Sequence, residues 1–341
     1  MASLRELGEF EVLRRLVRAR RADAAAEPDV VVGAGDDAAV LRPGAGADIV
    51  VTTDAFVEGR HFLPAWSAPA ATGARLAHAN LSDLAAMAAT PRWALLSIGA
   101  RPDTDADDLV ALQSGLAATL ATEGAAVVGG NLAAVEGAEW YSLTLVGETP
   151  RGRAWTRYGA RPGDLLAVSG TPGRAGAGLA LARALGEGAR APEWQPLLEA
   201  WLAPHAHVAL ARALRGTGAV TAAIDISDGF AGDLGHLCEA SGIGAEVEEA
   251  VWPDDPLLAR AAERLGVPLA TLRCGPSDDY ELLLAVDPGG RADCEAAARA
   301  AGVPLAFIGR FTGAPSVLAL SGRDGLTRPL PGAGFDHFEA R

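Results

Sequence analysis

The sequence predicts two layered domains in which helices pack on β-sheets, a fold of the α/β or α+β class. Its 341 residues suit two domains of ordinary size, and 50% of them are hydrophobic, which is enough for two cores. Apolar strand-like and helix-like runs alternate loosely in both halves, and the pattern restarts near Pro150. We therefore expect one domain over residues 1–149 and a second over residues 150–341.

The first half opens with an amphipathic pattern, because apolar residues of the first twenty fall near one helical face. Later runs are short and apolar, as in strands, or longer with apolar residues three to four apart, as in helices. In order, they predict a helix over 4–20, a strand over 48–56, a helix over 71–89, a strand over 93–100, a helix over 106–123, and strands over 125–131 and 140–148.

The second half repeats the alternation. Its segments predict a strand over 164–170, a helix over 174–186, a strand over 219–229 that meets a helix at Ser227 or Asp228, a strand over 279–286, a helix over 290–301 and a strand over 305–310.

Composition excludes several classes of function. The formal net charge of −14 argues against nucleic acid as the main partner, since phosphate backbones require basic surface. The chain contains no lysine, which removes Schiff-base, Walker A and protein-kinase lysine mechanisms. There is no apolar run long enough for a membrane span and no signal-peptide core, so we expect a cytoplasmic protein without a membrane partner.

Acidic and hydroxyl residues gather where apolar segments end, which is where layered α/β folds build their sites. They are Asp36 and Asp37; Thr52, Thr53 and Asp54; Asp83; Asp225, Ser227 and Asp228; and Asp278, Asp279 and Glu281. Solvated turns and helix caps are the alternative for each segment. Together, the segments indicate a cleft that holds two or more Mg²⁺ ions and a nucleotide triphosphate.

Two glycine-rich stretches leave alternatives open. The stretch "GTPGRAGAG" (170–178) lies between a predicted strand and helix, but it lacks a lysine and does not match G-x-G-x-x-G. A tight structural turn is favoured there over a phosphate-binding loop. In "VVGGN" (127–131), the glycines allow a close backbone approach to a ligand, and a plain β-turn is an equal interpretation.

Two further side chains are candidates for contacts with ligands. Arg157 follows the predicted domain junction, where a phosphate contact and ordinary solvated surface are both possible. His61 follows Asp54 by seven residues and is a candidate for substrate contact or for the core.

Seven motifs occur in the order found in thiamine-monophosphate kinases, which this chain resembles over nearly its whole length. They are "GAGDDAAVL", "TTDAFVEGRHF", "NLSDLAAMAATPRW", "GRAWTRYGARPGD", "DISDGFAGDL", "SDDYELLL" and "GFDHF". Aminoimidazole ribonucleotide synthetase and related ATP-using enzymes share the general architecture. The resemblance implies that fold, with the N-terminal domain pairing in a homodimer.

The resemblance also implies an activity: Mg²⁺-assisted, direct transfer of the γ-phosphoryl group of ATP to thiamine monophosphate, without a covalent nucleophile on the enzyme. Implied Mg²⁺ ligands are Asp36, Thr52, Thr53, Asp54, Asp83, Asn131, Asp225 and Asp228. Implied ATP contacts are Gly130, Asn131, Arg157 and Ser227, and implied substrate contacts are His61, Asp278 and Phe335.

The chain departs from the family pattern at two sites. Asn131 stands where the family has Asp, which keeps an oxygen ligand but loses a charge, and Ser277-Asp278 stands where the family has Gly-Glu. Two alternatives are open, and these departures favour the second. One is a related ATP-dependent kinase or synthetase acting on another small molecule, and the other is a non-catalytic nucleotide-binding paralogue.

Overall fold

The computed structural model describes residues 6, 15–16, 30–32 and 40–335. The chain divides into two compact units, the first made of Met1–Leu84 and Ala89–Ala154 and the second of Ala85–Ala88 and Trp155–Arg341. Most of the helix predicted over 4–20, together with Asp36 and Asp37, lies outside the described residues. None of the described helices combines the length and hydropathy needed to cross a lipid bilayer.

The first unit is built on a four-stranded sheet with the order β3-β6-β4-β5, in which only the β4–β5 pair is parallel. Its strands are β3 (Ala47–Val57), β4 (Thr90–Ala100), β5 (Ala126–Ala134) and β6 (Trp140–Pro150). Its helices are α3 (Pro69–Ala86) and α4 (Ala106–Thr122), and the short strands β1 (Val30–Val32) and β2 (Val40–Leu41) pair separately.

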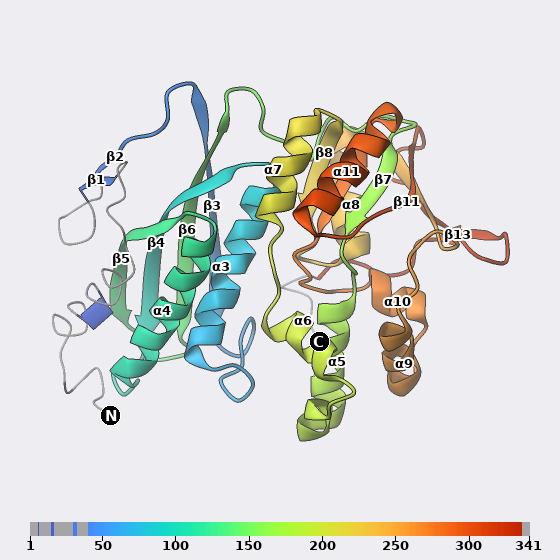
Figure 1. Ribbon diagram of the computed structural model, residues 1–341. Helices are drawn as coiled ribbons and strands as arrows, with labels where there is room; N and C mark the ends of the chain where they lie inside the picture. Colours follow the sequence, from blue (N-terminus) through green and yellow to red (C-terminus); the bar gives the residue numbers. More distant parts are fainter. Residues whose placement is uncertain (1–5, 7–14, 17–29, 33–39, 336–341) are drawn as a thin grey trace. The chain divides into compact units, whose positions relative to one another are not determined.

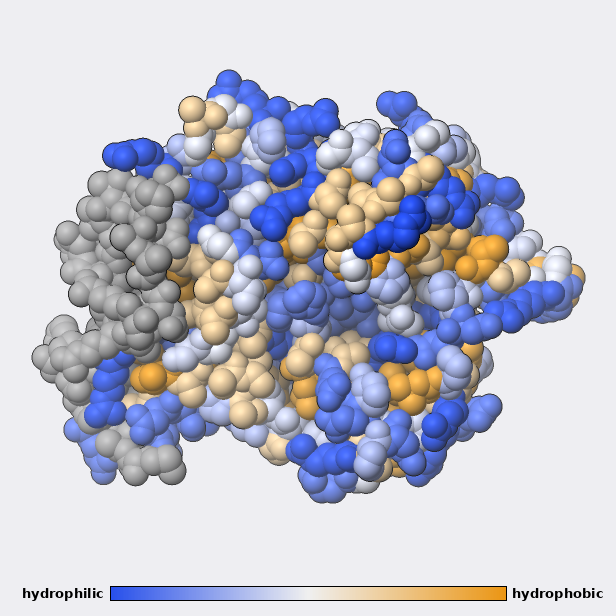
Figure 2. All heavy atoms as spheres, in the orientation of Figure 1, coloured by the Kyte–Doolittle hydropathy of each residue, from blue (hydrophilic) through white to orange (hydrophobic). Residues whose placement is uncertain are grey.

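Helices α3 and α4 lie on the same side of this sheet (Figure 1). They pack so closely that only glycine fits at two contact points. A Cβ atom on Gly73 would lie 1.9 Å from the Leu112 carbonyl oxygen, and one on Gly115 would lie 2.0 Å from the Ala70 carbonyl oxygen. The sheet thus has one helix-covered face. Figure 2 shows the molecule in the same orientation, with hydrophilic and hydrophobic residues interspersed on this side.

The opposite face of the sheet has no helix on it among the described residues. Its side chains include Ile49, Val51 and Leu95, which are 45%, 61% and 39% exposed. Side chains alternate between faces along a strand, so Thr52 and Asp54 point the other way, toward α3.

The second unit is built on a seven-stranded sheet with the order β13-β12-β9-β11-β7-β10-β8, in which β12 and β9 are the one parallel pair described. Its strands are β7 (Leu165–Ser169), β8 (Val220–Asp225), β9 (Gly244–Glu248), β10 (Leu282–Val286), β11 (Leu305–Thr312), β12 (Leu318–Ser321) and β13 (Thr327–Pro329).

The helices of the second unit are α5 (Arg174–Leu185), α6 (Gln195–Leu202), α7 (Val208–Thr217), α8 (Phe230–Ser241), α9 (Pro256–Leu265), α10 (Leu269–Cys274) and α11 (Arg291–Ala301), with 3-10 turns η1 (Gly186–Arg190) and η2 (Pro288–Gly290). Strand β10 is buried along its whole length. Helix α8 contributes Phe230 to the same hydrophobic core, where its ring centroid lies 4.7 Å from that of Trp252.

Two predicted strand boundaries in this unit were wrong. The strand predicted over 219–229 ends at Asp225, and its helix begins at Phe230, because a loop with its own hydrogen bonds intervenes. The strand predicted over 279–286 begins at Leu282, because Tyr280 adopts a φ of +55° that no strand tolerates. Both boundaries therefore fail at loops that carry candidate site residues.

Candidate active site

The first acidic cluster joins β3 to α3. Thr52 and Asp54 are two residues apart on β3 and share the face that meets α3, which carries Asp83. The Thr52 hydroxyl donates to Asp83 Oδ2 at 2.5 Å, and the Asp54 amide donates to Asn80 Oδ1 at 3.2 Å. The structure thus brings together three of the side chains that were predicted as metal ligands.

The surroundings of the Asp54 carboxylate disfavour its charge. Burial, and secondarily the nearby Asp83 carboxylate, raise the pKa of Asp54 to about 6. Among the described residues, no donor forms a hydrogen bond to the Asp54 side chain. Two carboxylates and a hydroxyl form a hard oxygen donor set that fits Mg²⁺, which also keeps several waters. Groups of three or more His, Cys, Asp or Glu side chains suited to a metal do not occur in the described part of the chain.

Two other predicted ligands do not join this cluster. Thr53 points to the opposite face of the sheet, where the Thr144 hydroxyl donates to it at 3.2 Å. Asn131 is exposed on β5 and is in register with Ser97, which is in register with Ser142. Register partners share a face, so Asn131 belongs to the row of Ser97 and Ser142 and not to that of Asp54.

The "VVGGN" stretch is neither a turn nor an open loop. It continues as strand β5 through Gly129 and Gly130, so the predicted Gly-Gly turn was wrong. A Cβ atom at Gly130 would lie 1.9 Å from the Leu96 carbonyl oxygen of β4. Position 130 must therefore be glycine because strand β4 leaves no room for a side chain there.

The His61 imidazole is held in one orientation just after β3. The Val57 amide donates to its Nδ1 at 3.1 Å, and the ring stacks on Phe56 with centroids 5.7 Å apart. Arg75 Nη1 donates to the His61 carbonyl oxygen at 2.6 Å. Since Nδ1 accepts a hydrogen bond, the neutral ring carries its proton on Nε2 and presents a donor there.

In the second unit, the loop from Ile226 to Gly229 connects β8 to α8. Asp225 ends the strand and is buried, and Ser227 and Asp228 follow it. A residue that sequence analysis missed shapes this loop: Asp233, on the first turn of α8. Its Oδ2 atom accepts from the amides of Ser227, Asp228 and Gly229 at 3.0, 3.0 and 3.1 Å.

Asp233 could have been found from its place in the sequence. It follows "DISDG" within the first turn of a predicted helix, where a carboxylate accepts free amides and faces the positive end of the helix dipole. Burial, and then the nearby Asp228, raise its pKa to about 7, while its three amide hydrogen bonds act in the opposite direction. Asp233 fixes the backbone that presents Asp228.

The loop before β10 is held in a similar way. Asp279 is buried and accepts from the amides of Gly173 at 2.7 Å and Ala175 at 2.9 Å, and the Ser277 hydroxyl accepts from the Gly176 amide at 2.7 Å. These amides belong to the "GTPGRAGAG" stretch, so they serve the fold. This supports a structural turn there over a phosphate-binding loop.

The two loops of the second unit are tied together through their backbones. The Tyr280 amide donates to the Ile226 carbonyl oxygen and the Ile226 amide donates to that of Glu281, both at 2.8 Å. A positive φ costs energy in an aromatic residue, and these two hydrogen bonds hold Tyr280 in it. Asp278 is half-buried next to this bridge.

The remaining predicted contacts of the second unit are Arg157 and Phe335. Arg157 is exposed, and its carbonyl oxygen accepts from the Ser241 hydroxyl at 2.9 Å. The Phe335 amide donates to the Asp228 carbonyl oxygen at 3.0 Å. Phe335 is therefore anchored to the same loop that carries Asp228.

Comparison with known proteins defines the class. The chain matches the AIR synthase related protein N-terminal domain over residues 35–149 and the corresponding C-terminal domain over residues 161–319. It is 36% identical over 336 residues to the thiamine-monophosphate kinase of Escherichia coli strain K12. The alignment covers 97% of this chain and 98% of that relative. Within the AIR synthase related proteins, the chain belongs to the thiamine-monophosphate kinase family.

Solved structures support the same assignment. The thiamine-monophosphate kinase of Stenotrophomonas maltophilia K279a aligns with a TM-score of 0.80 at 31% identity, over 92% of this chain and 96% of that one. The structure of AaThiL complexed with AMPPCP and TMP aligns with a TM-score of 0.75 at 27% identity, over 99% of both chains. The two-domain layered fold predicted from the sequence is confirmed.

Proposed function

We propose that this protein transfers the γ-phosphoryl group of ATP to thiamine monophosphate, which yields thiamine diphosphate and ADP. The observation that carries the proposal is full-length similarity to thiamine-monophosphate kinases, together with an acidic pair on β3 and α3 that fits Mg²⁺. A related structure holds AMPPCP, an ATP analogue with a carbon bridge between its β and γ phosphorus atoms, together with TMP.

The reaction needs no covalent intermediate on the protein. A phosphate oxygen of thiamine monophosphate attacks the γ phosphorus, a new P–O bond forms, and the bond to the β–γ bridging oxygen breaks so that ADP leaves. Positioning and charge neutralisation dominate this chemistry. Because the chain has no lysine, arginines, backbone amides and bound Mg²⁺ are left for that task.

The residues fall into three proposed roles. For Mg²⁺ we propose Asp36, Thr52, Thr53, Asp54, Asp83, Asn131, Asp225 and Asp228, with Thr53 and Asn131 serving a different ion from Asp54 and Asp83 because they lie on the opposite face of the first sheet. For ATP we propose Gly130, Asn131, Arg157 and Ser227, and for the substrate His61, Asp278 and Phe335. Bound Mg²⁺ would neutralise phosphate charge and orient the oxygens of ATP. The imidazole of His61 is held in one orientation by the Val57 amide, as a side chain that contacts a substrate requires.

We also propose that the protein is a homodimer of the cytoplasm, where ATP is available. The support for a dimer is the face of the first sheet on which no described helix lies and on which Ile49, Val51 and Leu95 are exposed. Exposed apolar side chains of this kind are stabilised when they are covered, and a second copy presents the same surface.

The test is an assay of purified protein with ATP, Mg²⁺ and thiamine monophosphate, in which thiamine diphosphate and ADP are both quantified. We expect the two products in equal amounts, and no product in excess chelator. Thiamine and a panel of other phosphate monoesters serve as acceptor controls. A better acceptor in that panel, or tight ATP binding without any turnover, would refute the proposal.

A further inference from the structure

The last described segment of the chain, residues 330–335, crosses the start of α8, and we call it the C-terminal strap. Its first residue, Leu330, is buried in the core of the second unit, and its amide donates to the Leu318 carbonyl oxygen at 2.9 Å. Its last residue, Phe335, donates its amide to the Asp228 carbonyl oxygen at 3.0 Å. The strap is thus fixed at both ends by backbone hydrogen bonds.

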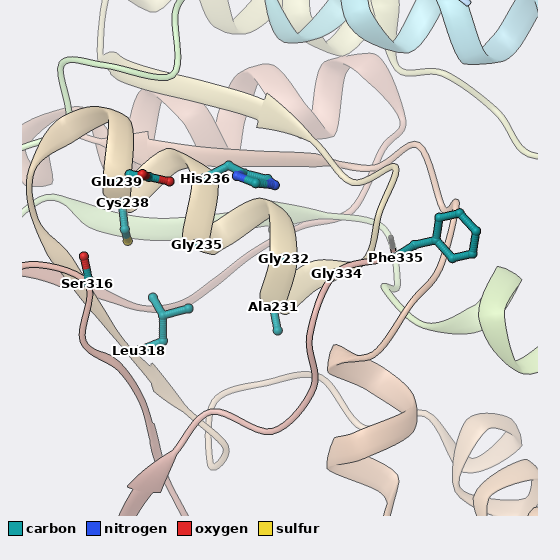
Figure 3. Close-up of a pocket in the computed structure, with 10 residues that line it drawn as sticks. All are labelled: Ala231, Gly232, Gly235, His236, Cys238, Glu239, Ser316, Leu318, Gly334 and Phe335. Atoms are coloured by element: carbon teal, nitrogen blue, oxygen red, sulfur yellow. The ribbon is translucent and has the colours of Figure 1, made fainter. Parts of the chain in front are cut away.

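Between these ends, the strap meets α8 backbone to backbone. A Cβ atom at Gly232 would lie 2.4 Å from the Gly334 Cα atom and 2.9 Å from its nitrogen, so no side chain fits there. Figure 3 shows Gly232 on α8 directly beside Gly334. The absence of a side chain at Gly232 is therefore a condition for the strap to lie where it does.

The neighbouring glycine of α8 is different. A Cβ atom at Gly235 would meet only the Leu318 Cδ1 atom, at 3.7 Å, which is an ordinary contact. Gly232 and Gly235 both line the same surface pocket of about 460 Å³ between α8 and the strap. The two positions therefore differ in one respect, which is whether a methyl group collides with the strap.

The strap directs the Phe335 ring. In Figure 3 the ring points away from the side chains of His236, Glu239 and Ser316, so its backbone lines the pocket and its ring does not enter it. The position of the ring depends on the strap, and through the Asp228 hydrogen bond it follows the loop between β8 and α8.

We propose that Gly232 is a positioning residue: by leaving room for Gly334, it seats the strap so that Phe335 is held at a fixed place relative to Asp228. This rests on the proposed function, in which Phe335 contacts thiamine monophosphate and Asp228 holds Mg²⁺. Moving the strap would weaken substrate binding and leave the sites for ATP unchanged.

The test compares Gly232→Ala with Gly235→Ala. Both gain the same helix propensity, but only Gly232→Ala displaces the strap, so Gly235→Ala should melt at or above the wild-type temperature and Gly232→Ala below Gly235→Ala. For Gly232→Ala we expect the KM for thiamine monophosphate to rise about tenfold, as for loss of one aromatic contact, with the KM for ATP within about twofold of wild type. For Gly235→Ala, both constants should stay within about twofold of wild type. Equal KM values for thiamine monophosphate in the two variants would overturn the proposal.

A double-mutant cycle separates strap placement from other effects. Phe335→Ala should raise the same KM, and adding Gly232→Ala to it should change little more, because both act through one ring. Additive effects would contradict the proposal. If Gly232→Ala does not fold, Gly334→Ala tests the same contact from the strap, since its Cβ atom would lie 3.1 Å from the Gly232 Cα atom.

Hydrogen exchange gives a readout that does not need turnover. The Phe335 amide should exchange faster in Gly232→Ala than in wild type, and at the wild-type rate in Gly235→Ala. If the wild-type protein does not phosphorylate thiamine monophosphate, the proposed function fails and this measurement still decides the placement of the strap. Unchanged exchange in Gly232→Ala would show that Gly232 does not seat it.

Discussion

Two acidic regions of the molecule differ in how many hydrogen-bond donors their carboxylates receive. In the first unit, Asp54 lies beside Asp83 and no described residue donates a hydrogen bond to its side chain. In the second unit, Asp233 accepts three backbone amides and Asp279 accepts two. The carboxylate without donors is suited to a cation, and the carboxylates with several donors are suited to shaping a loop.

The pKa values do not make this distinction by themselves. Burial is the main cause that raises the pKa of Asp54 to about 6 and those of Asp233 and Asp279 to about 7. The second cause does not separate them either, because it is a nearby carboxylate for both Asp54 (Asp83) and Asp233 (Asp228). The number of hydrogen-bond donors is therefore the better guide to the role of each group.

The largest expected effect follows removal of Asp54. Asp54→Ala should lower kcat by about a hundredfold or more, because a metal ligand is lost. In chelator, its melting temperature should equal or exceed that of wild type, because a buried charge beside Asp83 has been removed. Steady-state kinetics at saturating Mg²⁺ and thermal melts in chelator measure the two effects. A near-normal kcat in Asp54→Ala would show that Asp54 is not a metal ligand.

Asp233→Ala should behave in the opposite way. Three amides lose their acceptor, so the free energy of unfolding should fall by about 2 kcal/mol, with or without Mg²⁺. Urea unfolding measures this loss. If Asp233→Ala were as stable as wild type, the contrast between the two regions would not hold.

Asn131→Asp restores the carboxylate of the family and tests whether the opposite face of the first sheet senses the metal. A charge close to Mg²⁺ should lower the Mg²⁺ concentration for half-maximal rate by about tenfold, which corresponds to about 1.4 kcal/mol. The substitution is nearly isosteric and Asn131 is exposed, so packing should be unaffected. Identical Mg²⁺ titrations for the two proteins would place residue 131 away from the metal.

The smallest effect concerns Asp279 and pH. In the folded state the pKa of Asp279 is raised to about 7 from an ordinary value of 3.8. At a pH between these two values, the folded state therefore keeps a proton that the unfolded state has released. This contribution lowers stability as pH rises through that window. In Asp279→Asn this contribution is absent, so the stability of the variant relative to wild type should rise by about 1 kcal/mol between pH 6 and pH 8. If the free energies of unfolding of the two proteins changed in parallel with pH across this range, the raised pKa of Asp279 would be contradicted.

The sequence identified the layered two-domain fold because long apolar strands and amphipathic helices carry a strong periodic signal, as in β3 and α4. It also placed Thr52, Asp54 and Asp83 among the candidate ligands, and the structure brings these side chains together. Nine strands and α-helices, each of ten residues or fewer, received no prediction: β1, β2, α6, α7, β9, α9, α10, β12 and β13.

The roles of individual acids were harder to predict. "DISDGFAGDL" and "SDDYELLL" contain Asp233 and Asp279 next to proposed ligands, and all are carboxylates near strand ends. What separates them is which backbone amides they reach, and those amides come from loops as distant in sequence as Gly173. Tertiary contacts of this kind leave no local pattern in the sequence. Thr53 and Asn131 illustrate the same limit, since strand register decides the face to which each belongs.

The most direct test of the contrast is a count of bound divalent ions in the presence of AMPPCP. Mn²⁺ binding, followed by electron paramagnetic resonance, should show at least one ion fewer in Asp54→Asn than in wild type. Asp279→Asn, which alters a carboxylate held by amides, should bind the wild-type number. Equal counts in wild type and Asp54→Asn, or a loss in Asp279→Asn alone, would contradict the assignment of the Asp54 carboxylate to the metal.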